Sequence, residues 1–353
     1  MALALPDLSP ILPWYQENKR DLPWRHTRDP YRIWISEIML QQTRVEAVKG
    51  YYERFLDRLP DVASLAAVSD GELMKLWEGL GYYSRARNLK KAAITVCEKH
   101  GGVFPREYDE VLALSGIGEY TAGAICSFAF DLPYPAVDGN VLRVAARLLL
   151  FEGDVLDPKN KKALTAAVAA AQPPERAADF NQAMIELGAT VCLPNGVPKC
   201  GECPLAAACA ARRAGRACEL PVRKKPAPRK IEERTVLILR AGDTVALQKR
   251  PETGLLSGLF EPFCLAGRKT LDEVAAYLAK GGLVPLYLTP LGEAKHIFTH
   301  IEWHMTGFEV ILPPESLETV RKTLGETLFF APRDEIDKSF AIPSAYRAYR
   351  PYM

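Results

Sequence analysis

The residues that decide the fold are Leu114-Ser-Gly-Ile-Gly-Glu-Tyr-Thr-Ala122, followed after one more helical pattern by Val137-Asp-Gly-Asn140. Gly116 and Gly118 separate two segments of helical periodicity. Glycine permits a tight turn and a close approach of the backbone to a partner. The second helix then begins with free N–H groups, and such an N-terminus binds phosphate. A glycine pair of this kind equally forms plain turns between helices. Further residues have to distinguish a phosphate-binding hairpin from such a turn.

The whole segment from Leu114 to Asn140 resembles the helix-hairpin-helix motif and catalytic aspartate of the endonuclease III superfamily of DNA glycosylases. Two prolines end the helix that separates the hairpin from Asp138. The resemblance implies that the backbone at Gly116 and Gly118 contacts a DNA phosphate. It also implies that Asp138 is a carboxylate facing the deoxyribose, and that Asn140 holds Asp138 or a water molecule in place.

The composition is that of an ordinary globular protein. The chain has 353 residues, of which 48% are hydrophobic and 25% charged, enough for two or three domains. Its net charge is only +2, so a DNA-binding surface has to come from local clusters and helix termini. The first residues lack the basic segment of a signal peptide, and no apolar run is long enough to cross a bilayer. A cytoplasmic, nucleoid-associated protein is expected.

A second motif, Ser36-Glu-Ile-Met-Leu-Gln-Gln-Thr43, lies in an earlier helical pattern. Helical spacing places Glu37 on one face with Ile33 and Leu40. Apolar neighbours disfavour the charged carboxylate, so the pKa of Glu37 is expected to rise until the group carries a proton near neutral pH. A glutamate on the helix surface is the alternative.

Together with Leu22-Pro-Trp-Arg25 and Pro30-Tyr31, this motif resembles the signature of MutY-type adenine DNA glycosylases. The resemblance implies that Glu37 is the general acid that protonates N7 of an adenine flipped out of the duplex. Asp138 then stabilises the oxocarbenium-like sugar or adds to it. The residues implied to line the adenine pocket, enter the base stack or otherwise contact DNA are Arg20, Trp24, Arg25, Leu40, Gln41, Gln42 and Gln182.

Two tyrosines refine this prediction. Tyr120 stands where bifunctional relatives carry a lysine that forms a Schiff base, and a phenol cannot form that imine. We therefore predict a monofunctional glycosylase that leaves an abasic site, with Tyr120 orienting the Asp138 side of the pocket. Tyr82 lies between glycines and the arginines Arg85 and Arg87. An aromatic residue there is either part of the core or, as the resemblance implies, a wedge beside the opposite, lesion-bearing base.

Four cysteines, Cys192, Cys200, Cys203 and Cys209, lie within eighteen residues, and the other four are scattered. A disulfide framework is not expected, which indicates a reducing compartment. On spacing alone, an iron–sulfur cluster and a tetrahedral zinc ion fit equally well. The resemblance favours a [4Fe–4S] cluster in a structural role, with redox sensing as the weaker hypothesis. The family has six residues between its first two cysteines and this chain has seven, an extension that a loop readily tolerates.

Residues 234–353 resemble the C-terminal domain of the same family, which has a NUDIX-hydrolase-like fold and reads 8-oxoguanine. The match rests on residues 255–262 and on Phe298, Thr299 and His300, which are implied to contact the lesion. The chain lacks the Gly-x5-Glu-x7-Arg-Glu-x2-Glu-Glu box, so nucleotide hydrolysis is not expected. The family has serine where this chain has Thr299, whose methyl group is expected to weaken lesion preference. Alternatively, Phe298 and His300 are only the alternating faces of a strand.

The expected fold class is multidomain, with an all-α helix-hairpin-helix glycosylase domain containing a [4Fe–4S] cluster and an α+β NUDIX-like C-terminal domain. A run of five positive charges and two prolines at 223–230 predicts an exposed linker, either a plain tether or a contact to DNA phosphates. The expected boundaries are 1–221 for the glycosylase domain (27–135 as a six-helix lobe, 1–26 with 136–221 as the iron–sulfur lobe), 222–233 for the linker and 234–353 for the C-terminal domain.

The chain is thus identified as a member of the MutY-type family, expected to excise adenine mispaired with 8-oxoguanine or guanine in base excision repair. Double-stranded DNA with such a mismatch is the expected partner. A monomer is expected, and contacts with other repair proteins are compatible with this role. The alternatives are a thymine or oxidised-pyrimidine glycosylase of the same superfamily and a catalytically idle DNA-binding scaffold. A scaffold has no need of two pocket carboxylates, which Glu37 and Asp138 provide.

Overall fold

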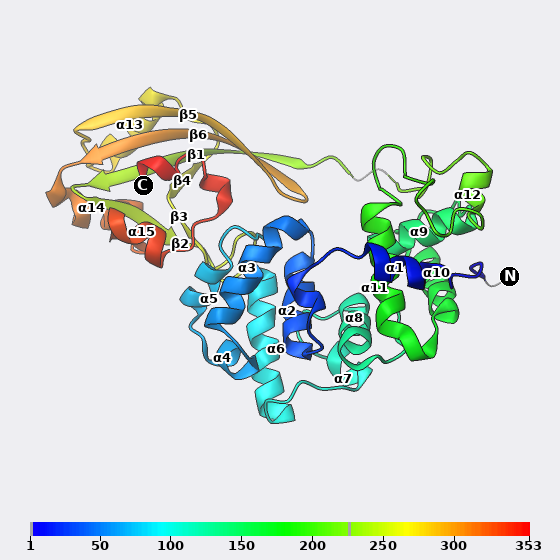
Figure 1. Cartoon of the computed structure of the whole chain (residues 1–353). Coiled ribbons are helices and arrows are strands. Elements are labelled where there is room, and N and C mark those ends of the chain that lie inside the picture. The colour runs from blue at the N-terminus through cyan, green and yellow to red at the C-terminus, as the bar shows by residue number, and fades with distance from the viewer. Residues whose placement is uncertain (1–2, 225–226) are drawn as a thin grey trace. The chain divides into compact units, whose positions relative to one another are not determined.

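The computed structural model describes residues 3–224 and 227–353, which fall into two compact units (Figure 1). Within these residues, the first unit runs to Ala67 and resumes at Asn88. The second unit consists of the segment Val68–Arg87 and the C-terminal part of the chain. Lys225 and Pro226, in the middle of the predicted linker, lie outside the described residues.

The first unit is helical, as predicted, and none of its described residues forms a strand. Its helices are α1 (Ile11–Asn18), α2 (Pro30–Leu40), α3 (Val45–Arg58), α4 (Val62–Ala67), α7 (Tyr108–Leu112), α8 (Glu119–Phe130), α9 (Gly139–Leu149), α10 (Pro158–Ala171), α11 (Ala177–Thr190) and α12 (Ala210–Arg213), together with most of α6 (Ser84–His100). Among these described residues, no helix is both long and apolar enough for a bilayer span.

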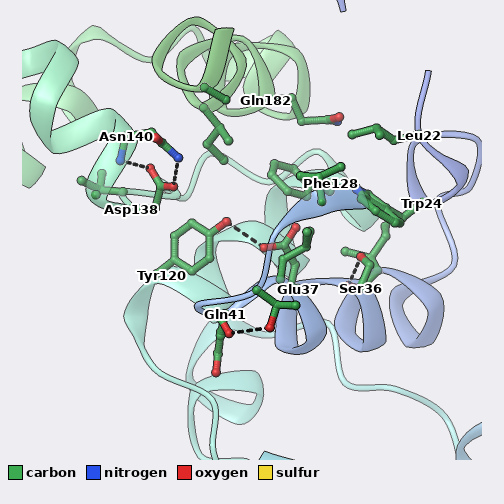
Figure 2. A pocket seen from close by; sticks show the side chains of 18 of the residues that line it. Leu22, Trp24, Ser36, Glu37, Gln41, Tyr120, Phe128, Asp138, Asn140 and Gln182 are labelled. Atoms are coloured by element: carbon green, nitrogen blue, oxygen red, sulfur yellow. Dashed lines mark hydrogen bonds between the residues drawn. The ribbon is translucent and has the colours of Figure 1, made fainter. Parts of the chain in front are cut away.

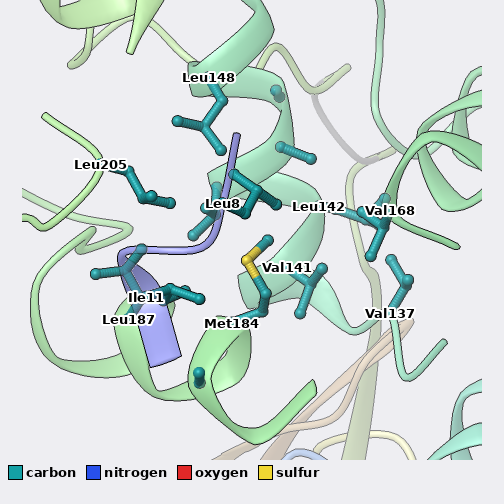
Figure 3. Close-up of a cluster of buried hydrophobic side chains, with 14 of the residues drawn as sticks. Leu8, Ile11, Val137, Val141, Leu142, Leu148, Val168, Met184, Leu187 and Leu205 are labelled. Carbon is teal, nitrogen blue, oxygen red and sulfur yellow. The ribbon is translucent and has the colours of Figure 1, made fainter. Parts of the chain in front are cut away.

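The core beside the candidate site is built from α1, α9 and α11 (Figure 3). Val141, Leu142 and Leu148 on α9 pack against Met184 and Leu187 on α11. Gly188 permits this approach, because a Cβ atom there would lie 2.5 Å from the Cβ of Asn140. The helix pair therefore presses the first turn of α9, where Asp138 and Asn140 lie, against α11.

The glycine hairpin connects α7 to α8. Gly116 has a φ of +78°, and a Cβ atom there would lie 2.6 Å from the Cβ of Asn88, so this position requires glycine. Gly118 is different: it has extended backbone at the N-cap of α8, and a Cβ atom added there would meet nothing within 4 Å. The space in front of Gly118 is open to a ligand.

The second unit is an α+β domain around a seven-stranded mixed sheet. The strand order is β3-β2-β1-β6-β5, with β4 also paired to β1 and β7 to β2. The strands are β1 (Lys230–Ala241), β2 (Thr244–Lys249), β3 (Phe260–Glu261), β4 (Phe263–Ala266), β5 (Tyr287–Ile297), β6 (Ile301–Leu312) and β7 (Leu328–Pro332). Helices α13 (Leu271–Lys280), α14 (Leu317–Leu324) and α15 (Arg333–Ser339) complete it, and α5 (Asp70–Leu76) belongs to the same unit.

Strand β1 is longer than the sequence indicates. It pairs in parallel with β6 from Lys230 opposite Ile301 to Ala241 opposite Leu312, so its first four residues lie inside the segment predicted as linker. Pairing with β6 supplies backbone partners that no local pattern shows. Both faces of the sheet are covered, since Val236 and Ile238 belong to one buried cluster and the alternate residues of β1 to another.

The segment Val68–Arg87 is bound to the C-terminal part of the chain by side-chain hydrogen bonds. Arg87 donates to the carbonyl oxygen of Ser257 at 2.8 Å and to its hydroxyl at 2.6 Å. Glu78 accepts from the backbone N–H of Ile342 at 3.2 Å. The loop that holds Tyr82 is thus part of the second unit, although its sequence is contiguous with the helices of the first.

Candidate active site

The first unit contains a cavity of about 740 Å³ between α2, α8, α9 and α11 (Figure 2). Eleven residues that the sequence analysis names for catalysis or DNA contact, from segments far apart in the chain, line it together. They are Arg20, Trp24, Arg25, Glu37, Leu40, Gln41, Gln42, Tyr120, Asp138, Asn140 and Gln182. We refer to this space as the main cavity.

Glu37 enters the main cavity from the third turn of α2. Asp29 caps this helix by accepting a hydrogen bond from the N–H of Tyr31 at 2.9 Å. Glu37 is 6% exposed, and Ile33 and Leu40 line the same cavity, so the predicted helix face is confirmed. The carboxyl group is therefore held in a largely apolar wall with access to the cavity.

Burial raises the pKa of Glu37 to about 7. The nearby Asp138 adds to this rise, while the hydrogen bond from the Tyr120 hydroxyl to Oε2, 2.7 Å long, works against it. Among the described residues, no hydrogen bond to Oε1 occurs. Glu37 therefore has one oxygen fixed by Tyr120 and one available to a bound base, and its raised pKa allows it to carry a proton near neutral pH.

Tyr120 forms its hydrogen bond with Glu37. We expected Tyr120 to orient the Asp138 side of the pocket, whereas in the structure its hydroxyl donates to Glu37, because α8 directs this side chain toward α2 (Figure 2). Burial raises the pKa of Tyr120 well above its usual range. The phenol therefore stays neutral and acts as a hydrogen-bond donor to the acid.

Asp138 caps α9 and lies across the main cavity from Glu37 (Figure 2). Its Oδ1 accepts from the N–H groups of Asn140 and Val141, both at 2.8 Å, and its Oδ2 accepts from the Asn140 side-chain amide at 2.6 Å. Burial raises the pKa of Asp138, and these three donors oppose the rise. Because both oxygens accept from N–H donors, the bonding is that of a carboxylate.

Asn140 is held in turn by Arg143, which is 3% exposed. Arg143 donates from Nη2 to the side-chain oxygen of Asn140 at 2.9 Å and from Nε to the carbonyl oxygen of Cys192 at 2.8 Å. The side chain of Asn140 thus has its oxygen bound to Arg143 and its nitrogen bound to Asp138. This fixes the orientation of the Asp138 carboxylate.

The structure reveals a buried carboxylate that the sequence analysis did not single out. Glu186 is 0% exposed and accepts from Arg20 at 2.7 and 2.8 Å and from Arg25 at 2.7 Å. Burial opposes the charge of Glu186, but the arginine hydrogen bonds outweigh it and bring its pKa to about 2. Arg20 and Arg25 are therefore held at the cavity wall by Glu186, whose single negative charge matches half of their combined charge.

Several other residues of the cavity wall were also missed: Leu22, Phe128 and Lys161. Leu22 begins the Leu22-Pro-Trp-Arg25 motif, but no role was inferred for it. Phe128 stands in an apolar run whose pattern indicates only burial, and Lys161 belongs to the first turns of α10, far from every motif in the sequence. Neither Phe128 nor Lys161 carries a local signal that separates a cavity wall from an ordinary core or surface position.

The four clustered cysteines have partly buried, free thiols. Burial raises the pKa of Cys203 to about 11, and the thiols of Cys192, Cys209 and Cys200 add to the rise. The four thiols are therefore close enough to influence one another electrostatically. Within residues 3–224 and 227–353, they do not form a ready-made metal-binding group.

The second unit brings two predicted lesion contacts together. The Tyr82 hydroxyl lies 3.0 Å from the hydroxyl of Thr299. Tyr82 is 46% exposed and has a φ of +48°, so the loop holds this ring away from the core at some backbone cost. The predicted wedge and the predicted lesion-binding hydroxyl thus form one polar pair on the surface of this unit.

The residues on either side of Thr299 have different environments. Thr299 and His300 form the exposed turn between β5 and β6 and do not continue a strand. Phe298 packs edge-on against Trp303, with 4.8 Å between ring centroids, and against His296. Phe298 therefore anchors the turn to the core, and Thr299 and His300 are the side chains that it presents.

Comparison with known proteins gives the same two-part organisation. A family model described as HhH-GPD superfamily base excision DNA repair protein matches residues 35–170, and one described as NUDIX domain matches residues 234–350. The chain is 34% identical to the adenine DNA glycosylase of Buchnera aphidicola subsp. Baizongia pistaciae, with 86% of this chain and 85% of that protein covered. It is 36% identical to the adenine DNA glycosylase of Mus musculus, with 83% and 68% covered.

A solved structure of a thermostable thymine-DNA glycosylase is also similar, with a TM-score of 0.54 and 34% identity. That likeness covers 94% of the thymine-DNA glycosylase but only 58% of this chain. The similarity to the two adenine DNA glycosylases covers 86% and 83% of this chain. The adenine-specific relatives therefore match a larger part of the molecule.

Proposed function

Because the chain belongs to the adenine DNA glycosylases, within the HhH-GPD superfamily of base excision DNA repair proteins, we propose that it releases adenine paired with 8-oxoguanine or guanine. The observation that carries the proposal is the pair of carboxyl groups in the main cavity. Glu37 has a pKa of about 7 and Asp138 is bonded as a carboxylate. One cavity thus provides an acid and an anion at the same pH.

The two groups divide the reaction between them. Glu37 donates its proton to N7 of the extruded adenine, which turns the base into a better leaving group. Positive charge then develops on the deoxyribose, where the Asp138 carboxylate stabilises it or forms a bond to C1′. Water then attacks C1′, displacing Asp138 where a bond has formed, and the proton that it loses restores the acid form of Glu37, which leaves free adenine and an abasic site. Tyr120 and Asn140 keep the two carboxyl groups in position.

We propose that the enzyme is monofunctional. Schiff-base chemistry needs an amine that is activated by burial or by a neighbouring charge. Tyr120 carries a phenol in place of an amine. Lys161 lines the main cavity, but its side chain is exposed, so burial does not activate its amine. Strand cleavage at the abasic product is therefore not expected.

The polar pair of Tyr82 and Thr299 supports a role of the second unit in reading the base opposite the adenine. An exposed aromatic ring stacks on a base, and a hydroxyl forms hydrogen bonds to the edge of a base. 8-oxoguanine differs from guanine in a carbonyl oxygen at C8 and a proton at N7. A hydroxyl group that serves as both donor and acceptor, as Thr299 does, suits this edge.

The cysteine segment supports a [4Fe–4S] cluster held by Cys192, Cys200, Cys203 and Cys209. Four sulfur ligands and no histidine nearby suit iron–sulfur chemistry. When bound, the cluster would cross-link the segment after α11. Side chains of α9 also hold this segment: Arg143 donates to the carbonyl oxygen of Cys192, and Arg147 donates to that of Leu193.

Single-turnover base release from matched duplexes tests the function. Adenine opposite 8-oxoguanine and opposite guanine should be released, and adenine opposite thymine should stay. The same reactions, analysed without alkaline treatment, should show intact strands. Thymine release with no adenine release would favour the thymine-glycosylase alternative, and no release of either base would favour the binding scaffold. Rapid strand cleavage at abasic DNA would contradict the monofunctional assignment.

Substitutions at Thr299 test the reading of the lesion. Thr299→Ser keeps the hydroxyl and should retain the preference for 8-oxoguanine over guanine in single-turnover release. Thr299→Ala loses the hydroxyl and should reduce that preference by about 2- to 10-fold, which corresponds to one hydrogen bond. Tyr82→Phe removes the same hydrogen bond from its other end and serves as a matched variant. Equal preference in wild type and all three variants would reject the role of this pair.

A further inference from the structure

A second cavity, of about 710 Å³, adjoins the main cavity along α10. Four residues line both spaces: Tyr120, Val137, Leu156 and Lys161. We call this second space the side groove. The two spaces therefore adjoin at these four residues.

The charge of the side groove is concentrated on α10. Lys161 and Lys162 both line it, and both side chains are exposed. In the described part of the chain, neither amine forms an ion pair or hydrogen bond. The groove has one carboxylate in its wall, Glu119 at the start of α8, and no other. The two lysine amines are thus unpaired in the described residues, whereas Arg20 and Arg25 each form an ion pair with Glu186.

The position of these lysines opposes helix stability. The N-terminus of a helix carries the positive end of its dipole and favours acidic side chains. The first five residues of α10 contain three lysines, Lys159, Lys161 and Lys162, and no acidic residue. Asp157 at the N-cap is acidic, but its carboxylate accepts from the N–H groups of Lys159 and Asn160. A bound anion would offset this unfavourable charge.

An apolar side chain stands beside the lysines. Leu156 is 59% exposed, and it lies where the main cavity meets the side groove. An apolar contact next to two cations suits a ligand that alternates apolar and anionic parts. A sugar–phosphate backbone has this character, with carbon atoms of deoxyribose between phosphates.

We propose that the side groove binds the backbone of the adenine-bearing strand directly beside the extruded nucleotide. Lys161 binds the phosphate at the junction with the main cavity, Lys162 binds the next phosphate along the groove, and Leu156 packs on the sugar between them. This inference rests on the proposed function, because it requires a nucleotide in the main cavity. It adds a second phosphate-binding surface to the hairpin at Gly118.

The salt dependence of DNA binding tests the proposal. Each phosphate contact contributes about 0.9 to the slope of log Kd against log salt concentration. Lys161→Gln and Lys162→Gln should each lower the slope by about 0.9, and the double variant by about 1.8. Lys159→Gln is the matched control, since it removes the same charge from the same helix turn but lines neither cavity. It should leave the slope unchanged. The probe is a duplex with a non-hydrolysable adenosine analogue opposite 8-oxoguanine.

A single uncharged methylphosphonate, moved along the adenine-bearing strand, identifies the contacted phosphate. At one position beside the analogue, it should weaken wild-type binding as much as Lys161→Gln does, and it should not weaken Lys161→Gln further. Equal salt slopes for Lys159→Gln and Lys161→Gln would overturn the proposal. So would a methylphosphonate that weakens binding by Lys161→Gln as much as it weakens binding by the wild type at every position in the strand. Base release by the wild type at saturating enzyme is measured in parallel. Failure of the proposed function abolishes that release, whereas failure of this inference leaves it intact.

Discussion

Replacing Glu37 with glutamine is expected to slow single-turnover adenine release by roughly 10²- to 10⁴-fold, the usual contribution of a positioned general acid. Glutamine has nearly the same shape and still accepts a hydrogen bond from Tyr120, but it carries no transferable proton. Binding of a non-hydrolysable duplex should stay within about threefold of the wild type, because the substitution removes no charge from a DNA-facing surface. A variant that releases adenine at the wild-type rate would exclude Glu37 as the acid.

The pH dependence gives a second readout of the same group. The pKa of Glu37 is about 7, so the protonated acid is present below this pH and is lost above it. Adenine release should therefore fall as the pH rises through 7. The hydrogen bond from Tyr120 lowers the pKa of Glu37, so in Tyr120→Phe the rate of adenine release should fall at a higher pH than in the wild type. If the rate of Tyr120→Phe falls at the same pH as the wild type or at a lower pH, the hydrogen bond does not set the pKa of Glu37.

Asp138→Asn should reduce adenine release by at least about 10²- to 10³-fold, the typical effect of removing one preorganised electrostatic contact to a transition state. Asparagine remains a good N-cap, so its side-chain oxygen can still accept from the N–H groups at the start of α9. The variant loses the negative charge opposite the developing cation while keeping the cap. Its amide nitrogen also faces the side-chain amide of Asn140, which removes one of the three hydrogen bonds.

A matched control for this charge change lies one helix further along the chain. Asp157 caps α10 with the same pattern, accepting from the N–H groups two and three residues ahead at 3.0 and 3.2 Å, and it is exposed. Asp157→Asn should have wild-type rates of base release. Thermal unfolding of both variants checks the cap: a large loss of stability confined to Asp138→Asn would show that its slow reaction reflects a disturbed fold. Equal rates for the two variants would remove Asp138 from the mechanism.

Much of the site was accessible from the sequence because its signals are local. The glycine hairpin and the helix face shared by Glu37, Ile33 and Leu40 each depend on residues within one or two turns. The structure bears out the shared face. The resemblance to a known family added the expected roles, which no helical pattern could supply.

The remaining features depend on contacts between distant parts of the chain. Glu186 is paired with arginines more than 160 residues away, and nothing near it in the sequence indicates an ion pair. Tyr120 donates to Glu37, 83 residues earlier in the chain, because α8 and α2 lie against each other in the fold. Tyr82 lies 217 residues from Thr299 and yet shares a hydrogen bond with it.

The sequence by itself determined the helical and α+β parts, the family and the chemical type of the two carboxyl groups. These follow from periodicity, turn residues and motifs, which act over a few positions of a continuous chain. Only the tertiary structure decided the pKa of Glu37, the carboxylate bonding of Asp138, the side groove and the inclusion of residues 68–87 in the second unit. Burial and hydrogen bonding set these properties, and both depend on which distant segments the fold brings into contact.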